Sequence, residues 1–348
     1  MRVRTAALIA ATAVSTGAVA NSAMAAAPAG PPPPPTATNG HQVQQVAAGL
    51  HTPTSFAFGA GQVFEGDGGA ETANPPNGGV FVLKNGTGTL IPGSPLFVGG
   101  LAWHKGALYV SGAVLTAKGP KWQILKWTGW NGTTFTTQKA IYTAPKGFQG
   151  FNGLAFGADG RLYVGVDVGL LNNNDHGPST ISPYVYDILS MNTSGKAFKV
   201  FATGIRQPWQ MAFPKGSSSP FVSDLGQDKG AKNPPDFVLR VHQGDNYGFP
   251  TCNWTSSSSC AGFALPFQVF NPHTDLMGMV IIGNRLYMTS FLGPKGKGPG
   301  GEVLSIPLEG GKVKPLLKGF VAPTVGLGGN DGWLYVGELT GQVFRVRP

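Results

Sequence analysis

The chain has 348 residues, with 25 Lys and Arg against 16 Asp and Glu, and a formal net charge of +9. This length is enough to bury one large core. The 53 glycines and 29 prolines argue against a mainly helical protein, because both residue types disfavour helix interiors, and they favour an all-β fold. No basic cluster interleaves with aromatic residues, so nucleic acid is not an expected partner.

The first residues have the pattern of a secretory signal peptide. Arg2 and Arg4 precede an apolar run, and small residues at Ala23 and Ala25 form a cleavage site. We therefore predict a signal over residues 1–26 and a secreted protein; a frayed N-terminal helix is the alternative. No later segment reaches about eighteen apolar residues, so no membrane span is expected.

A proline-rich spacer is predicted next, over residues 27–40. Five consecutive prolines favour a polyproline II conformation, which is semi-rigid and has no core of its own. The folded domain is then predicted over residues 41–348. Without Arg2 and Arg4 the remaining surplus of positive charge suits either solubility alone or weak attraction to an anionic partner such as a cell-wall polymer.

Similar segments recur along this domain and predict its architecture. Each has an apolar strand, a Gly-rich turn and a Leu-Tyr-Val-like strand, as in "GLAFGADGRLYVG". The copies begin near Ser55, Gly100, Gly153, Gln210, Gly278 and Val325. With the strand-like sequence between copies, this period predicts a six-bladed β-propeller, closed by an outer strand from the N-terminal "HQVQQVAAGL". An array of β-sandwiches is the alternative.

The only two cysteines, Cys252 and Cys260, are close in sequence and are expected to form a structural disulfide in an oxidising compartment.

Candidate functional residues stand where the copies differ. The residues before the inner strands are mixed: Thr54, Gly99, Asn152, Trp209, Met277 and Thr324. Only the third copy is followed by an acid, Asp167, and by a polar loop over residues 172–176, which is either a calcium loop or a solvated turn. The fourth copy carries Arg206, a clamp for a carboxylate or quinone oxygen, and then the oxygen donors Asp224, Gly226, Gln227 and Asp228. An Arg–Asp pair that ties two blades together is the structural alternative.

The fourth copy resembles a known family. "GIRQPWQMAF" and "SDLGQD…VHQGDNYGFPTC" are similar to segments of the soluble quinoprotein glucose/sorbosone dehydrogenases, and "NPHTDLMGMVI" is similar to a fifth-blade segment. The resemblance implies a six-bladed propeller that binds pyrroloquinoline quinone (PQQ) and calcium and oxidises sugars or aldehydes.

The resemblance also implies roles for individual residues. Arg206 would contact the quinone, with Gln207, Asn152 and Trp209 beside it. The carbonyls around Gly226 and Gln227, with Asp224, would hold calcium, and Asp167 would orient a catalytic histidine. Gln207 stands where the family usually has asparagine. Gln149 occupies the position of the histidine, and a neutral amide cannot act as a general base near pH 7. A replacement by His176 or His273 has no support from spacing.

Two other functions remain open. "FNGLAFGADGRLYVGVD" also resembles gluconolactonase-type propellers, which implies a divalent-metal hydrolase with Asn152, Glu65 and Asp224 as ligands. Alternatively, the propeller is a non-catalytic module that binds carbohydrate or protein. Trp122, Trp127 and Trp130 could then stack on sugars, although the odd spacing of the first two places at least one of them in the core.

Overall fold

The computed structural model describes residues 33–70, 77–117, 119–168, 183–227, 234–254, 260–293 and 300–348. The predicted signal peptide therefore lies outside the described residues, as do the polar loop at 172–176 and Asp228. The named elements of the described residues are all β-strands. Among these residues there is no helix long and apolar enough to cross a membrane.

The strands form a β-propeller made of antiparallel groups in chain order. Group 1 contains β3 (Pro53–Gly59), β4 (Gln62–Asp67), β5 (Gly79–Lys84) and β6 (Gly86–Leu90). Group 2 contains β7 (Phe97–His104), β8 (Ala107–Thr116), β9 (Gly119–Trp130) and β10 (Phe135–Thr143). Group 3 contains β11 (Phe151–Phe156), β12 (Leu162–Val166), β13 (Ile188–Met191) and β14 (Lys199–Ala202).

The second half of the chain repeats this arrangement. Group 4 contains β15 (Pro208–Ala212), β16 (Phe221–Asp224), β17 (Asp236–Arg240) and β18 (Gln268–Phe270). Group 5 contains β19 (Leu276–Ile282), β20 (Arg285–Ser290), β21 (Glu302–Pro307) and β22 (Lys314–Lys318). Group 6 contains β23 (Thr324–Asn330), β24 (Trp333–Glu338) and β25 (Val343–Val346).

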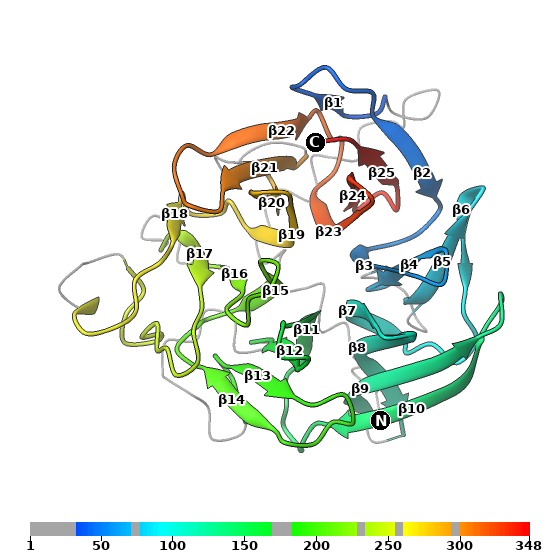
Figure 1. The fold of residues 1–348 in the computed structure, drawn as a ribbon, viewed down its shortest axis with the longest axis horizontal. Helices are drawn as coiled ribbons and strands as arrows, with labels where there is room; N and C mark the ends of the chain where they lie inside the picture. Colours follow the sequence, from blue (N-terminus) through cyan, green and yellow to red (C-terminus); the bar gives the residue numbers. More distant parts are fainter. Residues whose placement is uncertain are drawn as a thin grey trace, which may run out of the picture.

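The first strands of the groups, β3, β7, β11, β15, β19 and β23, lie nearest the centre of a ring (Figure 1). Each contacts the first strand of the next group, and β23 contacts β3. Apolar side chains fill the spaces between groups. One cluster joins Phe64 and Val80 of group 1 to Leu108 and Trp127 of group 2, all of them buried. The repeat therefore explains the core: the Leu-Tyr-Val strands supply the side chains packed between neighbouring sheets.

The N-terminal segment connects three groups. β1 (Thr36–Ala37) pairs with β22 of group 5, although it lies in the segment predicted as a spacer. β2 (Gln44–Ala48) pairs antiparallel with β25 and parallel with β6. The strands of groups 6 and 1 therefore belong to one sheet, with β2 between them.

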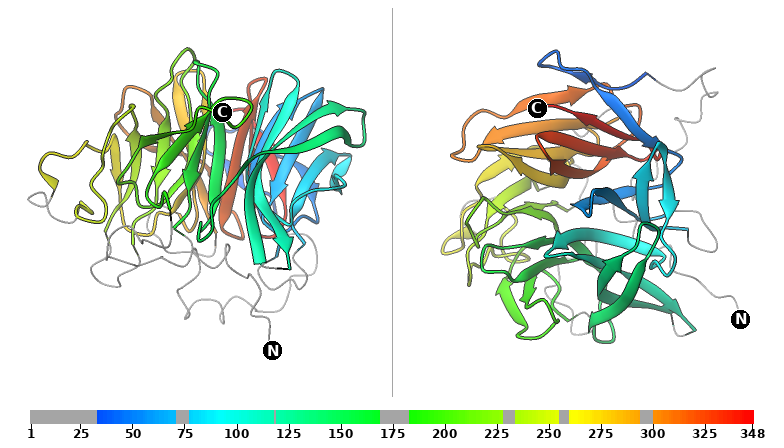
Figure 2. Two further views of the ribbon diagram at one scale, coloured as in Figure 1. Left: turned by 90° about the horizontal axis from the view of Figure 1, so that it is seen from below. Right: turned by 45° about the vertical axis from the view of Figure 1, so that its right-hand side comes forward.

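The antiparallel pairing gives the ring two different faces. The turns between first and second strands, such as the one between β7 and β8, lie on one side, which we call the turn face. The starts of the first strands and the ends of the second strands meet on the other side, as the pairing of Pro208 with Asp224 shows. We call this side the site face, because most of the predicted functional residues lie there. The left view of Figure 2 shows the ring from its edge, with the strands running between the two faces.

Candidate functional site

Arg206 and Gln207 form the centre of the candidate site, immediately before β15. Arg206 is only 5% exposed, and its Nη1 donates to the carbonyl oxygen of Leu225 at 2.8 Å and to Oε1 of Gln207 at 3.2 Å. The backbone N–H of Gln207 donates to Oδ1 of Asp224 at 2.8 Å. The guanidinium is therefore held in one place by Leu225, which follows β16, and by Gln207, which precedes β15.

Asp224 is a buried carboxyl with a perturbed pKa. Burial raises the pKa of Asp224 to about 7, and the Gln207 N–H and the charge of Arg206 oppose this rise. Asp67 occupies the equivalent position in group 1, since it pairs with Pro53 as Asp224 pairs with Pro208. Asp67 also accepts backbone N–H groups, from His51 at 2.8 Å and from Thr52 at 3.1 Å. Capping the segment before the first strand is thus one role that both acids share.

Asp167 lies beside this centre. Its Oδ2 accepts the side-chain amide of Gln207 at 3.5 Å, and its backbone N–H donates to the carbonyl of Gly150 at 2.9 Å. Gln149 immediately precedes Gly150 and is half-buried, and its amide donates to the carbonyl of Gly147 at 3.0 Å. The fold therefore brings Asp167 to the Arg206 centre through Gln207, whose longer side chain makes this contact.

A pocket opens next to Arg206. Arg206 itself lines it, together with Asp224, Leu225, Gly226 and Gln227. Its lining also includes aromatic residues, namely Phe237, Tyr247, Phe249 and Trp254. A cation and a carboxyl among aromatic residues form a site that could hold the polar edge of a flat ligand.

Asp236 is a functional candidate that the sequence analysis missed. It is 1% exposed, and its two oxygens accept the backbone N–H groups of Gly226 at 2.6 Å and Asp275 at 2.8 Å. Burial and the nearby charge of Asp275 raise its pKa. A Cβ on Gly226 would lie 2.7 Å from the carbonyl oxygens of Pro234 and Pro235, so only glycine fits there. The acid in "NPPDF", at the start of a strand, was the signal available in the sequence.

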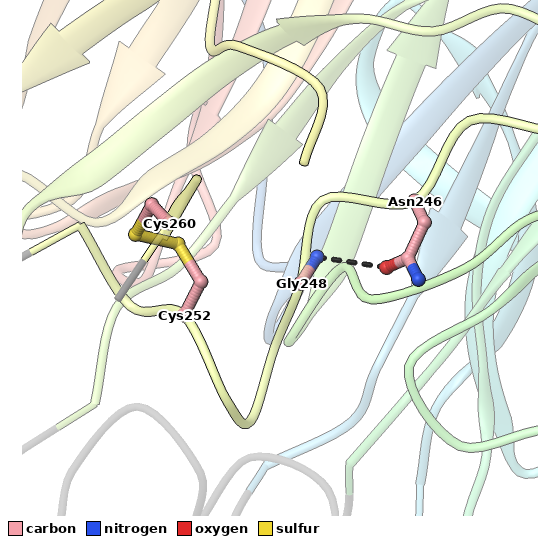
Figure 3. The surroundings of a disulfide bond; sticks show 4 residues. All are labelled: Asn246, Gly248, Cys252 and Cys260. Carbon is pink, nitrogen blue, oxygen red and sulfur yellow. Dashed lines mark hydrogen bonds between the residues drawn. A yellow bond between two sulfur atoms is a disulfide. The ribbon is translucent and has the colours of Figure 1, made fainter. Parts of the chain in front are cut away.

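The predicted disulfide is present and borders this pocket. Cys252 and Cys260 are bonded, and Cys252 is among the residues that line the pocket. Figure 3 shows the bond with the neighbouring turn, in which Oδ1 of Asn246 accepts the backbone N–H of Gly248 at 2.8 Å. A Cβ on Gly248 would lie 2.5 Å from the ring of Phe263 and 2.7 Å from Cβ of Cys252. The disulfide and this turn therefore hold one wall of the pocket in place.

Asn152 takes part in a series of hydrogen bonds between neighbouring groups. Its backbone carbonyl accepts the hydroxyl of Ser111 in group 2 at 2.8 Å, and its side-chain amide donates to the carbonyl of Pro208 in group 4 at 3.0 Å. Ser223 and Thr289 make equivalent bonds to Met277 at 3.1 Å and Val325 at 2.9 Å. In group 3 the residue equivalent to Ser111, Ser223 and Thr289 is Gly165, which has no hydroxyl. The Asn152 amide makes the hydrogen bond to the next group instead.

Group 1 also has a glycine, Gly66, at the position equivalent to Gly165. There the hydroxyl of Thr54 donates to the carbonyl of Val98 at 2.7 Å. At the junction of groups 6 and 1 the position is Gly337, and within the described chain no side chain of β23 or β24 donates to β3. This is the junction at which β2 joins the two groups.

Trp209 is buried in an apolar cluster on the site face. It packs with Leu225, Met277, Phe291 and Val325. Its indole N–H has no hydrogen-bond partner among the described residues. The ring is thus placed by packing near the start of β15, three residues after Arg206.

The side chains considered for the alternative functions lie elsewhere. Glu65 is in the middle of β4 and fully buried, and its carboxylate oxygens have no hydrogen-bond partner in the described part of the chain. Trp122 and Trp127 are both buried, and Trp130 is half-buried against Phe135. No group of three or more His, Cys, Asp or Glu side chains placed for a metal is found among the described residues.

Comparison with solved structures shows which proteins share this fold. A glucose dehydrogenase-type oxidoreductase from Thermus thermophilus superposes with a TM-score of 0.71 at 20% identity, over 88% of this chain and all of that one. The PQQ-bound form of aldose sugar dehydrogenase from Streptomyces coelicolor gives 0.66 at 19% identity, over 90% of this chain and 99% of that one. This chain has the fold of the sugar dehydrogenase propellers. The predicted resemblance to soluble quinoprotein dehydrogenases is therefore confirmed at the level of the fold.

Gluconolactonases are structurally more distant. A gluconolactonase from Xanthomonas campestris has a TM-score of 0.56 at 13% identity, over 93% of this chain and 99% of that one. No family model matches the chain, and no curated protein matches it in sequence.

Proposed function

We propose that the protein is a secreted six-bladed propeller of the sugar dehydrogenase type that binds PQQ and calcium on its site face. In this proposal the strand groups are the blades, and β2 is the outer strand that closes the ring. The observation that carries the proposal is the buried guanidinium of Arg206, which is held against Leu225 and Gln207 and lines a pocket that also contains aromatic residues.

The residues at this site suit such a cofactor. A planar guanidinium can make paired hydrogen bonds to a carboxylate or to quinone oxygens, and the aromatic wall suits a flat ring system. The backbone around Gly226 and Gln227 offers carbonyl oxygens, which are suitable ligands for calcium. When bound, PQQ would supply a two-electron oxidant for a sugar or an aldehyde. The PQQ-bound structure of the Streptomyces coelicolor enzyme supports this proposal.

Proton transfer is where this chain differs from the pattern that the resemblance implies. Gln149 stands at the position of the general base, and its amide cannot take up a proton near pH 7. Asp167 is held by Gln207 rather than by an imidazole at residue 149. We therefore propose that this chain binds the cofactor and orients it, but oxidises sugars slowly.

The gluconolactonase alternative has weaker support. It requires Asn152, Glu65 and Asp224 to share one metal. The Asn152 amide is bonded to Pro208, and Glu65 lies within β4, whereas Asp224 lies at the end of β16. No specific contact favours this second function.

Thermal unfolding of the mature protein tests the proposal directly. Samples without metal, with calcium, and with calcium plus PQQ should unfold at successively higher temperatures. A ligand at one hundred times its Kd adds about 2.7 kcal/mol to the free energy of unfolding. Arg206→Ala should weaken PQQ binding at least tenfold, which corresponds to about 1.4 kcal/mol. An unchanged PQQ affinity with a lower melting temperature would assign Arg206 a structural role only.

A further inference from the structure

The turn face carries a large excess of positive charge. The turns and the strand residues next to them contain the following cations: Lys84, Lys105, Arg161, Lys196, Lys199, Lys215, Arg240, Arg285, Lys312, Lys314 and Arg347. The same segments contain fewer carboxylates: Asp159, Asp245, Glu309 and Asp331. Each of groups 1 to 6 contributes at least one of these cations, so the charge is spread around the whole ring.

These cations are not neutralised by the acids beside them. Within the described ranges, none of the Lys and Arg side chains on the turn face lies within 4.0 Å of a carboxylate oxygen. Two of the acids have other partners. Asp159 accepts the hydroxyl of Tyr163 at 2.8 Å, and Asp245 accepts the backbone N–H of His242 at 2.7 Å. The lysines of this face are exposed and direct their charge to solvent, whereas the half-buried Arg161 and Arg285 donate to neighbouring protein groups.

Among the described residues, the site face has a different balance. The ends of the second strands and the segments next to them hold most of the remaining described carboxylates: Asp67, Asp167, Asp224, Asp236, Asp275 and Glu338. Most of these acids are buried, and the described cations toward this face are fewer, namely Lys121, Lys146, Arg206 and Lys318. A polyanion would therefore meet stronger attraction on the turn face. Net charge alone does not produce this preference; the placement of the residues does.

Aromatic rings hold some of the guanidinium groups on the turn face. Arg347 lies over the ring of Trp333, at 4.5 Å from its centroid, and Arg345 of β25, which is not among the turn-face cations named above, lies over the same ring at 4.4 Å. Arg240 lies over the ring of Phe221 at 5.8 Å. Side chains held in this way lose less conformational entropy when they bind an anion.

We propose that the turn face binds an acidic polysaccharide, a flexible chain with a carboxylate on successive sugars. A single small anion could reach only one or two of these widely spaced cations, and each exposed contact contributes little. A polymer can engage several of them at once, and its affinity then grows by multivalency. The exposed large apolar side chains in and next to these turns are Leu265 and Val200. They come from different groups, so they do not form the cluster of apolar anchors with which proteins insert into a lipid surface.

Two variants with equal net charge test the placement of the binding surface. One carries Lys105→Glu, Lys215→Glu and Lys312→Glu on the turn face. The matched control carries Lys121→Glu, Lys146→Glu and Lys318→Glu, which lie toward the site face. All six lysines are exposed, so both variants are expected to fold, and a melting curve checks this. Binding to polygalacturonate is measured by titration at low and at physiological salt, with uncharged dextran and duplex DNA as further probes.

The wild-type protein should bind polygalacturonate, bind it less tightly as salt is added, and ignore dextran. The turn-face variant should lose at least about tenfold in affinity, and the control less than about threefold. Equal losses in the two variants would show that net charge alone is responsible and would overturn the proposal. Absence of binding to polygalacturonate, or tighter binding to duplex DNA, would also overturn it. None of these measurements depends on PQQ, so their outcome is separate from that of the proposed oxidoreductase function.

Discussion

Glu65 provides a test of how this propeller tolerates a buried acid. The register places Glu65 opposite Phe56 on the first strand. The equivalent positions of the other second strands, each opposite an apolar residue of its first strand, are all apolar: Val110, Val164, Val222, Met288 and Val336. Burial, and to a lesser extent the charge of Asp67, raises the pKa of Glu65 well above its ordinary value of 4.5. We therefore expect Glu65→Gln to change the pH dependence of stability.

The sign of the effect follows from proton binding. Above pH 4.5 the unfolded chain loses the Glu65 proton, whereas the folded protein keeps it until the pH reaches the raised pKa. Stability is thus greatest below the unfolded pKa and falls as the pH rises, by about 1.4 kcal/mol for each pH unit in this interval. Glutamine has no proton to lose, so the variant should lack this slope. Its unpartnered amide adds a constant cost of about 1–3 kcal/mol, which does not vary with pH.

The assay is thermal or urea unfolding of wild type and Glu65→Gln at half-unit steps from about pH 4.5 to 8. The difference in free energy should shift in favour of the variant as the pH rises, which corresponds to about 1.5 °C in Tm per kcal/mol for a domain of about 300 residues. Glu309→Gln makes the same substitution at an exposed glutamate and serves as the matched control. A constant difference between Glu65→Gln and wild type over the whole range would refute the reasoning, because it would mean that folded Glu65 ionises normally.

Three further predictions concern the ring and the site. Asn152→Ala should lower the free energy of unfolding by about 1–2 kcal/mol, because the hydrogen bond to Pro208 is lost. The response of the melting temperature to calcium should stay unchanged. Loss of that response would instead make Asn152 a calcium ligand. Gln149→His should raise the rate of dye-linked sugar oxidation in the presence of PQQ by about 10²–10⁴-fold. A variant that binds PQQ but stays inactive would contradict the proposal that turnover is slow because residue 149 is not a base. A chain that begins at Leu50 should be less stable than one that begins at His41 by roughly 3 kcal/mol or more. The reason is that the backbone hydrogen bonds of β2 and the buried Ala47 are removed. Equal melting temperatures would show that β2 contributes little to stability.

Much of the fold could be predicted because the repeat is local. The apolar strand, the Gly-rich turn and the Leu-Tyr-Val strand are adjacent in sequence, so their pairing and their buried faces follow from periodicity. The segment expected to supply an outer strand forms β2. Its parallel pairing with β6 and the strand at Thr36–Ala37 depend on contacts between distant parts of the chain, and no periodic pattern indicates them.

The site was predictable only in part, for the same reason. Arg206, Gln207 and Asp224 are distinctive where the copies diverge, and the structure brings them together. Asp236 stands at the start of an ordinary strand, and its role appears only when Gly226 and Asp275 approach it. The two bonds of Asn152 likewise depend on a missing hydroxyl at Gly165, which is visible only once the sheets are placed side by side.

The position of β2 has a consequence for how the protein is made. β2 is among the first strands to be synthesised, yet it pairs with β25, whose register joins Gln44 to Arg345. Until β25 has been synthesised, β2 lacks this partner, and its unpaired edge is a template for pairing with other chains. Contacts of such long sequence separation also form slowly. Termination of the chain before β25 should therefore give an aggregation-prone product rather than a slightly shortened propeller.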